Sequence, residues 1–294
     1  MHSIRSGHCQ YQHHKLAYEI HGPEQANRPS ILLVHGVLLD AYVNRDIAAA
    51  LVKAGYRVIL LDLLGHGRSD APADARLYRL DFFAEQVLSA MDQLDLERVI
   101  LGGISLGTIT ALQVAVQHPE RIEALLLEMP VMEHAAPAAA LMLTPILLAA
   151  RYGARVYRPV TRLLGRLPRP KVNVWHSVFN AVIRDPEVTS AILHGLLVGP
   201  VVPPAAQRRK IPVPTLVIGH QGDWLHPFDD ARTLAEEIPG ADFIQAHSIL
   251  ELRTRPDRLM PQIVDFLSRR LTGTSEAASS KRRRSNSPAR SRRT

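Results

Sequence analysis

A serine between two glycines, in the middle of an apolar run, limits the folds open to this chain more than any other feature. Residues 99–116 read VILGGISLGTITALQVAV, and Ser105 has the spacing Gly-x-Ser-x-Gly. Residues 99–101 are of the types that fill a buried parallel strand, whereas apolar residues return at helical spacing from Thr108 onward. The pattern predicts a sharp strand-to-helix turn, in which the glycines allow close approach and the serine oxygen is exposed.

A nucleophilic serine needs N–H donors for the oxyanion that forms when it attacks a carbonyl group. Residues 31–34 (ILLV) are expected to form a strand that runs into Gly36, where glycine lets a peptide N–H turn inward. We expect the backbone N–H groups of Val37 and of Leu106, the residue after the serine, to be the two oxyanion donors.

The nucleophile also needs an imidazole base and a carboxylate that orients it. The segment PTLVIGHQGDWLHP predicts a strand at residues 215–218, followed by a loop that carries Asp223. The segment ADFIQAHSILEL predicts a short strand followed by His247. Serine, acid and histidine would then follow in the required chain order, with Asp223 orienting His247 and His247 deprotonating Ser105.

Other carboxylates compete with Asp223. Glu128 also ends an expected strand, IEALLLE, and stays the second candidate for the acid. Asp229 and Asp230 begin the segment FDDARTLAEEI, which has the pattern of a helix, so both are interpreted as helix N-cap carboxylates.

Other histidines compete with His247. His66 lies in a glycine-rich loop before the serine and is interpreted as part of that loop. His220 and His226 lie near Asp223 and are expected at most to line the pocket.

Five segments together resemble the α/β-hydrolase superfamily: VHGVLLD, LDLLGHGRSD, GGISLGTITALQVAVQHPERIEALLL, GHQGDWLHP and AHSILELRTRPDRLMPQIVDFL. The resemblance covers about residues 16–271 apart from the middle. It implies an α/β fold, with a mainly parallel, doubly wound sheet and catalytic groups at the carboxyl ends of its strands. It also implies that Ser105, Asp223 and His247 form the catalytic triad.

Ala246 departs from the family pattern, and Ser105 indicates which branches of the superfamily the chain resembles. Members of the superfamily often place glycine before the histidine, whereas this chain has Ala246. Ser105 resembles the esterase, lipase and carbon–carbon hydrolase branches, since haloalkane dehalogenases and epoxide hydrolases use aspartate at that position.

The expected strands divide the chain into a hydrolase core in two parts, residues 1–130 and 211–272, and an inserted helical cap, residues 131–210. Within the cap, residues 135–150 carry no charge, but Pro145 interrupts them and they fall short of the ~20 residues of a membrane-spanning helix. Arginines then recur every three or four residues opposite apolar positions, and Pro159 is expected to divide this stretch into two short helices. The arginine stripe is interpreted as a solvated face of the cap, with contact to a lipid surface as the alternative.

The chain carries a formal net charge of +7, of which residues 273–294 contribute +6. This tail lacks core-forming residues and is expected to be disordered, with at most weak contact with anionic surfaces and no specific binding of nucleic acid. The first ten residues have no apolar signal segment, and Cys9 is the single cysteine, so we expect a cytoplasmic protein. A group of residues near Cys9 lacks the spacing of a known metal site, and neither a metal nor a cofactor is expected. The group comprises His8, Cys9, His13 and His14.

The sequence therefore predicts a serine hydrolase that cleaves a carboxylic ester, with an apolar acyl group, through an acyl-enzyme on Ser105. The same residues could instead cleave a carbon–carbon bond or a thioester, or transfer an acyl group. A catalytically silent binding protein with this fold is the alternative from another class.

Overall fold

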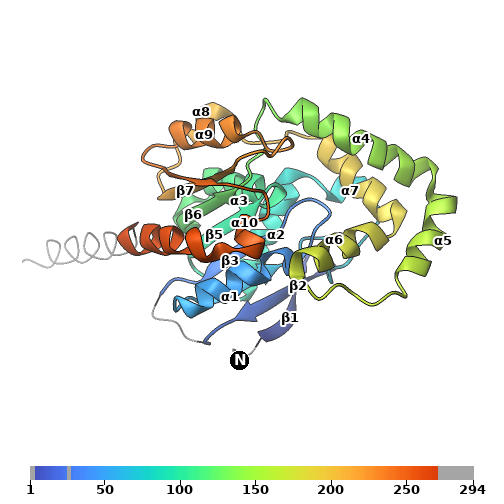
Figure 1. The fold of residues 1–294 in the computed structure, drawn as a ribbon, viewed down its shortest axis with the longest axis horizontal. Helices are drawn as coiled ribbons and strands as arrows, with labels where there is room; N and C mark the ends of the chain where they lie inside the picture. The colour runs from blue at the N-terminus through green and yellow to red at the C-terminus, as the bar shows by residue number, and fades with distance from the viewer. Residues whose placement is uncertain (1–3, 25–27, 271–294) are drawn as a thin grey trace, which may run out of the picture.

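The structure, a computed structural model, describes residues 4–24 and 28–270 and contains an eight-stranded sheet (Figure 1). The strand order is β1-β2-β4-β3-β5-β6-β7-β8. Strand β2 pairs antiparallel with both β1 and β4, and all other neighbouring strands pair parallel. The strands are β1 (Ile4–Tyr11), β2 (His14–His21), β3 (Ile31–Val34), β4 (Val58–Leu61), β5 (Val99–Ile104), β6 (Ile122–Glu128), β7 (Thr215–His220) and β8 (Asp242–Ala246). The predicted α/β fold with a mainly parallel sheet is confirmed.

Helices cover both faces of the sheet, because its parallel strands are apolar on both sides. One apolar core lies under α2, α3 and α9, and a second lies under α1 and the helix of residues 260–270. The helices are α1 (Arg45–Lys53), α2 (Leu80–Gln93), α3 (Leu106–Gln117), α4 (Ala136–Tyr152), α5 (Ala154–Leu164), α6 (Asn173–Ile183), α7 (Pro186–Val198), α8 (Ala205–Arg208), α9 (Phe228–Glu237) and α10 (Glu251–Thr254).

Four of the five helices between β6 and β7, α4 to α7, form the cap (Figure 1). Pro145 lies inside α4 and Pro159 lies inside α5, so neither proline divides a helix as the sequence predicted. The break falls instead at Gly153, where α4 and α5 are bent by 96°. The basic tail, residues 273–294, lies outside the described residues.

Candidate active site

Ser105 lies on a strained turn between β5 and α3, with φ +55° and ψ −110°. A side chain rarely adopts this backbone, and such strain is typical of functional positions. A Cβ atom at Gly103 would overlap the backbone of Gly107, and one at Gly107 would overlap the carbonyl oxygen of Val34 in β3. Both glycines are therefore required for strand and helix to meet at Ser105.

We expect Gly107→Ala to destabilise the fold by roughly 2–3 kcal/mol, as overpacking of a rigid core does. The added methyl group would meet backbone atoms of β3, which can yield only if α3 moves away from the sheet. Gly199→Ala is the matched control, since the nearest atom to its added carbon lies 3.7 Å away. Urea unfolding of both variants tests this, and equal midpoints would contradict the steric argument.

His226 is the imidazole in contact with Ser105. Its Nε2 atom lies 2.9 Å from Ser105 Oγ, and its Nδ1 atom lies 2.8 Å from Asp223 Oδ2. Because an ionised carboxylate only accepts hydrogen bonds, Nδ1 carries the proton and Nε2 is free to accept the serine proton. The three side chains form a continuous chain of contacts, from Asp223 to His226 to Ser105.

Asp223 is held as a carboxylate. The backbone N–H groups of Leu225 and His226 each donate to its Oδ1 atom at 3.0 Å. Burial alone would raise the pKa of Asp223, but the hydrogen bonds and charge of His226 and these N–H donors lower it below its usual value.

The structure places His226, and not the predicted base His247, in contact with Ser105. His247 is exposed, and its backbone N–H donates to Glu251 Oε2 at 2.6 Å. The carbonyl oxygen of the next residue, Ser248, lies 2.7 Å from His220 Nδ1. These two contacts fix the loop after β8 in a course that keeps the His247 side chain away from Ser105.

Glu128, the second candidate for the acid, pairs with Arg253 and His220. Its Oε1 atom lies 2.6 Å from Arg253 Nη1 and 3.0 Å from His220 Nε2, and all three side chains are buried or nearly so. Burial alone would raise the pKa of Glu128, but the two cationic partners lower it to about 2. The same carboxylate, with the Ser248 carbonyl, raises the pKa of His220 against the effect of burial. This cluster braces the ends of β6 and β7.

The two residues predicted as oxyanion donors are found at the cavity of Ser105. Val37 and Leu106 line the same cavity as Ser105 and His226. Within residues 4–24 and 28–270, neither backbone N–H donates to a protein acceptor, so both are available to a ligand. The positive φ in this loop belongs to Leu38, at +60°, and not to Gly36 as the sequence suggested.

Buried histidines support this loop from behind. His35 Nδ1 donates to the carbonyl oxygen of Gly36 at 2.8 Å, and its Nε2 accepts from the N–H of Leu63 at 3.0 Å. Burial lowers the pKa of His35 to about 4, which keeps the ring neutral. His66, whose ring stacks near His35, contacts the Leu64 carbonyl oxygen and belongs to the loop, away from the nucleophile.

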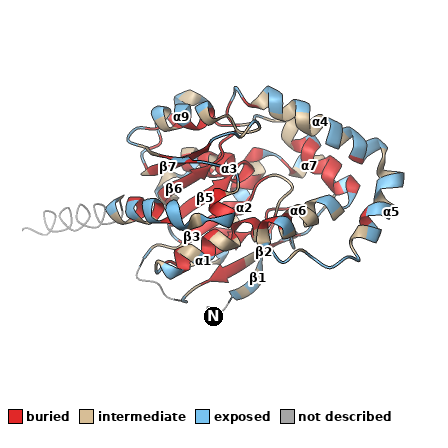
Figure 2. Ribbon diagram, in the orientation of Figure 1, coloured by how far each residue is buried: buried red, intermediate tan, exposed pale blue. Residues whose placement is uncertain are grey.

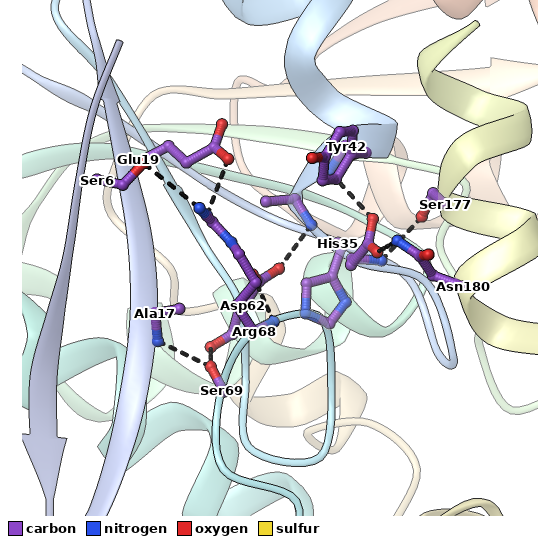
Figure 3. Close-up of polar contacts among 12 residues, drawn as sticks. Ser6, Ala17, Glu19, His35, Tyr42, Asp62, Arg68, Ser69, Ser177 and Asn180 are labelled. Atoms are coloured by element: carbon purple, nitrogen blue, oxygen red, sulfur yellow. Dashed lines mark hydrogen bonds and ion pairs between the residues drawn. The ribbon is translucent and has the colours of Figure 1, made fainter. Parts of the chain in front are cut away.

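The oxyanion loop, residues 35–44, is clamped between the cap and the sheet (Figure 3). The N–H of Asp40 donates to Ser177 Oγ at 2.9 Å, and Asn180 Nδ2 donates to the Asp40 carboxylate at 2.8 Å; both partners come from α6. On the sheet side, Asp62 accepts from the N–H of Ala41 at 2.7 Å. The cap thus helps to position the loop that carries an oxyanion donor.

Asp229 and Asp230 lie in the first turn of α9, two and three residues after its N-cap, Pro227, and not at the N-cap as the sequence predicted. Asp230 is buried and accepts from the N–H groups of Met132 and Ala135, at 3.1 and 3.3 Å. It ties the start of the cap to α9 and does not touch the nucleophile.

An apolar cavity of about 90 Å³ lies between the cap and Ser105. Its floor is formed by the nucleophile, His226 and the two oxyanion residues, and its roof comes from the cap. The roof side chains are Ala136, Ala139, Ala140 and Leu143 of α4, Leu196 and Leu197 of α7, and Pro200 and Val201 beyond it. Among the described residues, no group of three or more His, Cys, Asp or Glu side chains is placed to hold a metal ion.

The family follows from a comparison with known proteins. Residues 29–247 match the model of the alpha/beta hydrolase fold family. The chain belongs to the α/β-hydrolase family. This α/β hydrolase superposes on the enol-lactonase of Burkholderia xenovorans, with a TM-score of 0.72, 24% identity and coverage of 89% of this chain and 100% of that one. It also superposes on a thermophilic esterase of Thermogutta terrifontis, with a TM-score of 0.70, 22% identity and coverage of 90% and 99%.

Curated relatives match this α/β hydrolase over a shorter stretch. An epoxide hydrolase of Caballeronia sordidicola is 35% identical over 105 residues, which is 36% of this chain and 32% of that protein. A putative carbamate hydrolase of Variovorax paradoxus is 38% identical over 112 residues, or 38% and 41% of the two chains. The matches thus span about a third of the length of these relatives, whose names agree on hydrolysis and differ in the bond cleaved.

Proposed function

We propose that this α/β hydrolase is a serine hydrolase that cleaves a carboxylic ester of a short apolar acid. The observation that carries the proposal is the relay of Ser105, His226 and Asp223, with contacts of 2.9 and 2.8 Å, at the floor of an apolar cavity. A serine oxygen, a correctly oriented neutral imidazole and two free N–H donors are the groups that acyl transfer requires.

The reaction proceeds in two halves. Ser105 Oγ attacks the acyl carbon while its proton moves to His226 Nε2, and the oxyanion accepts hydrogen bonds from the N–H groups of Val37 and Leu106. The ester C–O bond then breaks, and His226 returns the proton to the departing alcohol oxygen. Water attacks the acyl-enzyme, gives one proton to His226, and the acid leaves as Ser105 Oγ takes that proton back.

The size and lining of the cavity support a short acyl group. A cavity of about 150 Å³ holds one benzene molecule in a protein core, and this cavity is smaller, at about 90 Å³. Its lining is apolar apart from the reacting groups, so desolvation favours hydrocarbon over a charged chain.

Nitrophenyl esters of increasing acyl length test both the chemistry and the cavity. We expect a burst of nitrophenol with the native chain, no burst with Ser105→Ala, and the highest kcat/KM at about two to four acyl carbons. Leu143→Ala, which enlarges the roof, is expected to shift the preference to longer chains. If no ester turns over and Ser105 fails to react with a fluorophosphonate probe, the chain is a silent binding protein instead.

The serine at position 105 distinguishes this chain from the epoxide hydrolases among its relatives. Epoxide hydrolases are among the curated matches, but the resemblance noted above assigns them an aspartate where this chain has serine. Carbon–carbon, thioester and acyl-transfer reactions would use the same relay. Substrates with a carbon–carbon or thioester bond at the carbonyl group test the first two, and product analysis in the presence of an added alcohol detects acyl transfer.

A further inference from the structure

Positive charge is concentrated in the cap. Residues 134–184 contain eight cationic side chains and no Asp or Glu. The whole chain carries +7, of which residues 273–294 contribute +6 and residues 134–184 contribute +8, so the remainder of the protein carries −7. The cationic residues of the cap are Arg151, Arg155, Arg158, Arg162, Arg166, Arg169, Lys171 and Arg184.

The apolar side of α5 faces away from the protein. Val156, Val160 and Leu163 of α5 recur at intervals of four and three residues, as one stripe of a helix does, and Leu167 follows four residues later, just beyond the helix. All four are exposed, Val156 by 75% and Leu163 by 64%. We call these four residues the cap ridge. Figure 2 shows α5 as an exposed helix at the edge of the molecule, away from the sheet.

The inward side of α5 is polar. Thr161 is buried, and Arg158 pairs with Asp185 and Glu187 at the start of α7, at 3.2 and 2.7 Å. The sequence interpretation, a solvated polar face, agrees with the exposed Arg155, Arg162 and Arg166, but α5 also exposes its apolar residues. Core packing does not explain an apolar stripe that faces solvent, and such stripes often mark interaction sites.

Arginines flank the cap ridge. Arg155, Arg162 and Arg166 are exposed, and none makes an ion pair within the described part of the chain. An amphipathic helix with arginine beside aliphatic side chains is suited to lie in the plane of a membrane interface, with the aliphatic groups among the lipids and the cations at the headgroups.

The helices of the cap turn sharply where α4 meets α5. No single helix in residues 4–24 and 28–270 is long and apolar enough to cross a bilayer. The pair α4 and α5 has the length and composition only together, and the two are bent by 96°.

We propose that the cap ridge docks on the surface of an anionic lipid bilayer. The arginines and the absence of carboxylates supply attraction to anionic headgroups, and the exposed valines and leucines supply the apolar insertion. A nucleic acid would use the cations but leave the aliphatic stripe in water, because its backbone offers phosphates. The lipid surface is the partner that uses both features.

Vesicle flotation tests the docking with the full chain. The native protein is expected to float with vesicles of phosphatidylcholine and phosphatidylglycerol, and to dissociate as ionic strength rises. Val156→Glu places a carboxylate on the ridge and is expected to weaken binding by about tenfold or more. Val198→Glu is the matched control, because Val198 ends α7 outside the ridge, is 76% exposed and adds the same charge. Circular dichroism confirms that both variants fold.

Four outcomes would overturn the proposal. Equal loss in both variants would assign the binding to overall charge, including that of residues 273–294. Equal flotation with pure phosphatidylcholine would remove the role of the arginines. Salt-sensitive binding to a DNA duplex without vesicle binding would assign the cap to phosphates alone. Self-association that Val156→Glu abolishes, again without vesicle binding, would make the ridge a contact between copies of the chain.

Discussion

His226→Ala is expected to lower kcat/KM for ester hydrolysis by about four to six powers of ten, whereas His247→Ala should change it by less than about threefold. His226 Nε2 is the acceptor for the serine proton, at 2.9 Å, and without it Ser105 stays a poorly nucleophilic alcohol. His247 is exposed and contributes a backbone hydrogen bond to Glu251, which alanine preserves. Steady-state kinetics on the best nitrophenyl ester measures both.

Asp223→Asn sharpens this test. An amide at position 223 would favour the wrong tautomer of His226, and a drop of roughly 10⁴ in kcat is expected while the fold is kept. If His247→Ala were the inactive variant and His226→Ala the active one, the loop after β8 would have to move to reach Ser105 in solution. That result would restore the base chosen from the sequence.

Glu128→Ala is expected to cost about 3–5 kcal/mol of unfolding free energy. The guanidinium of Arg253, buried and 2.6 Å from Glu128, would lose its carboxylate, and so would the ring of His220. A buried charge without its partner retains the desolvation penalty and loses the attraction that offset it. Urea unfolding followed by circular dichroism measures the loss.

A surface pair provides the control for that prediction. Glu187→Ala also removes a carboxylate from an arginine, Arg158, but both side chains are partly in water and the expected loss is below about 1 kcal/mol. In addition, Glu128→Leu combined with Arg253→Met should be more stable than Glu128→Ala, because it removes the orphaned charge as well. If Glu128→Ala matched Glu187→Ala, the cluster would not brace β6 and β7.

The fold and the nucleophile could be predicted because their signals are local. Apolar runs before Gly36 and Ser105 specify buried strands. Gly103 and Gly107 have no side chain, which lets strand and helix approach closely. The position of each expected strand end was therefore correct within a few residues.

The imidazole at the nucleophile could not be chosen in this way, because His226 and His247 both follow the serine and the acid in the chain. Their difference arises from tertiary contacts: His220 and Glu251 fix the loop after β8, and Asp223 holds His226. Two local signals pointed to His226. It lies three residues after Asp223 and directly before Pro227, where α9 begins, and Ala246 stands where the family often has glycine.

The cap shows a second limit of pattern reading. Periodicity identified the apolar and cationic residues of α5, but not that Val156, Val160 and Leu163 lie exposed beside the arginines. Ion pairs of Arg158 with the start of α7 decide that orientation.

One six-residue stretch between β7 and α9, GDWLHP, carries both the acid and the imidazole. The N–H groups of Leu225 and His226 donate to Asp223 within this stretch, so local hydrogen bonds alone hold the acid and the imidazole together. A shift of this stretch would change the distance from His226 to Ser105 without changing the contact between Asp223 and His226. The loop after β8 then contributes no reacting group, and we expect insertions or sequence changes there to be tolerated as long as Ser248 still contacts His220.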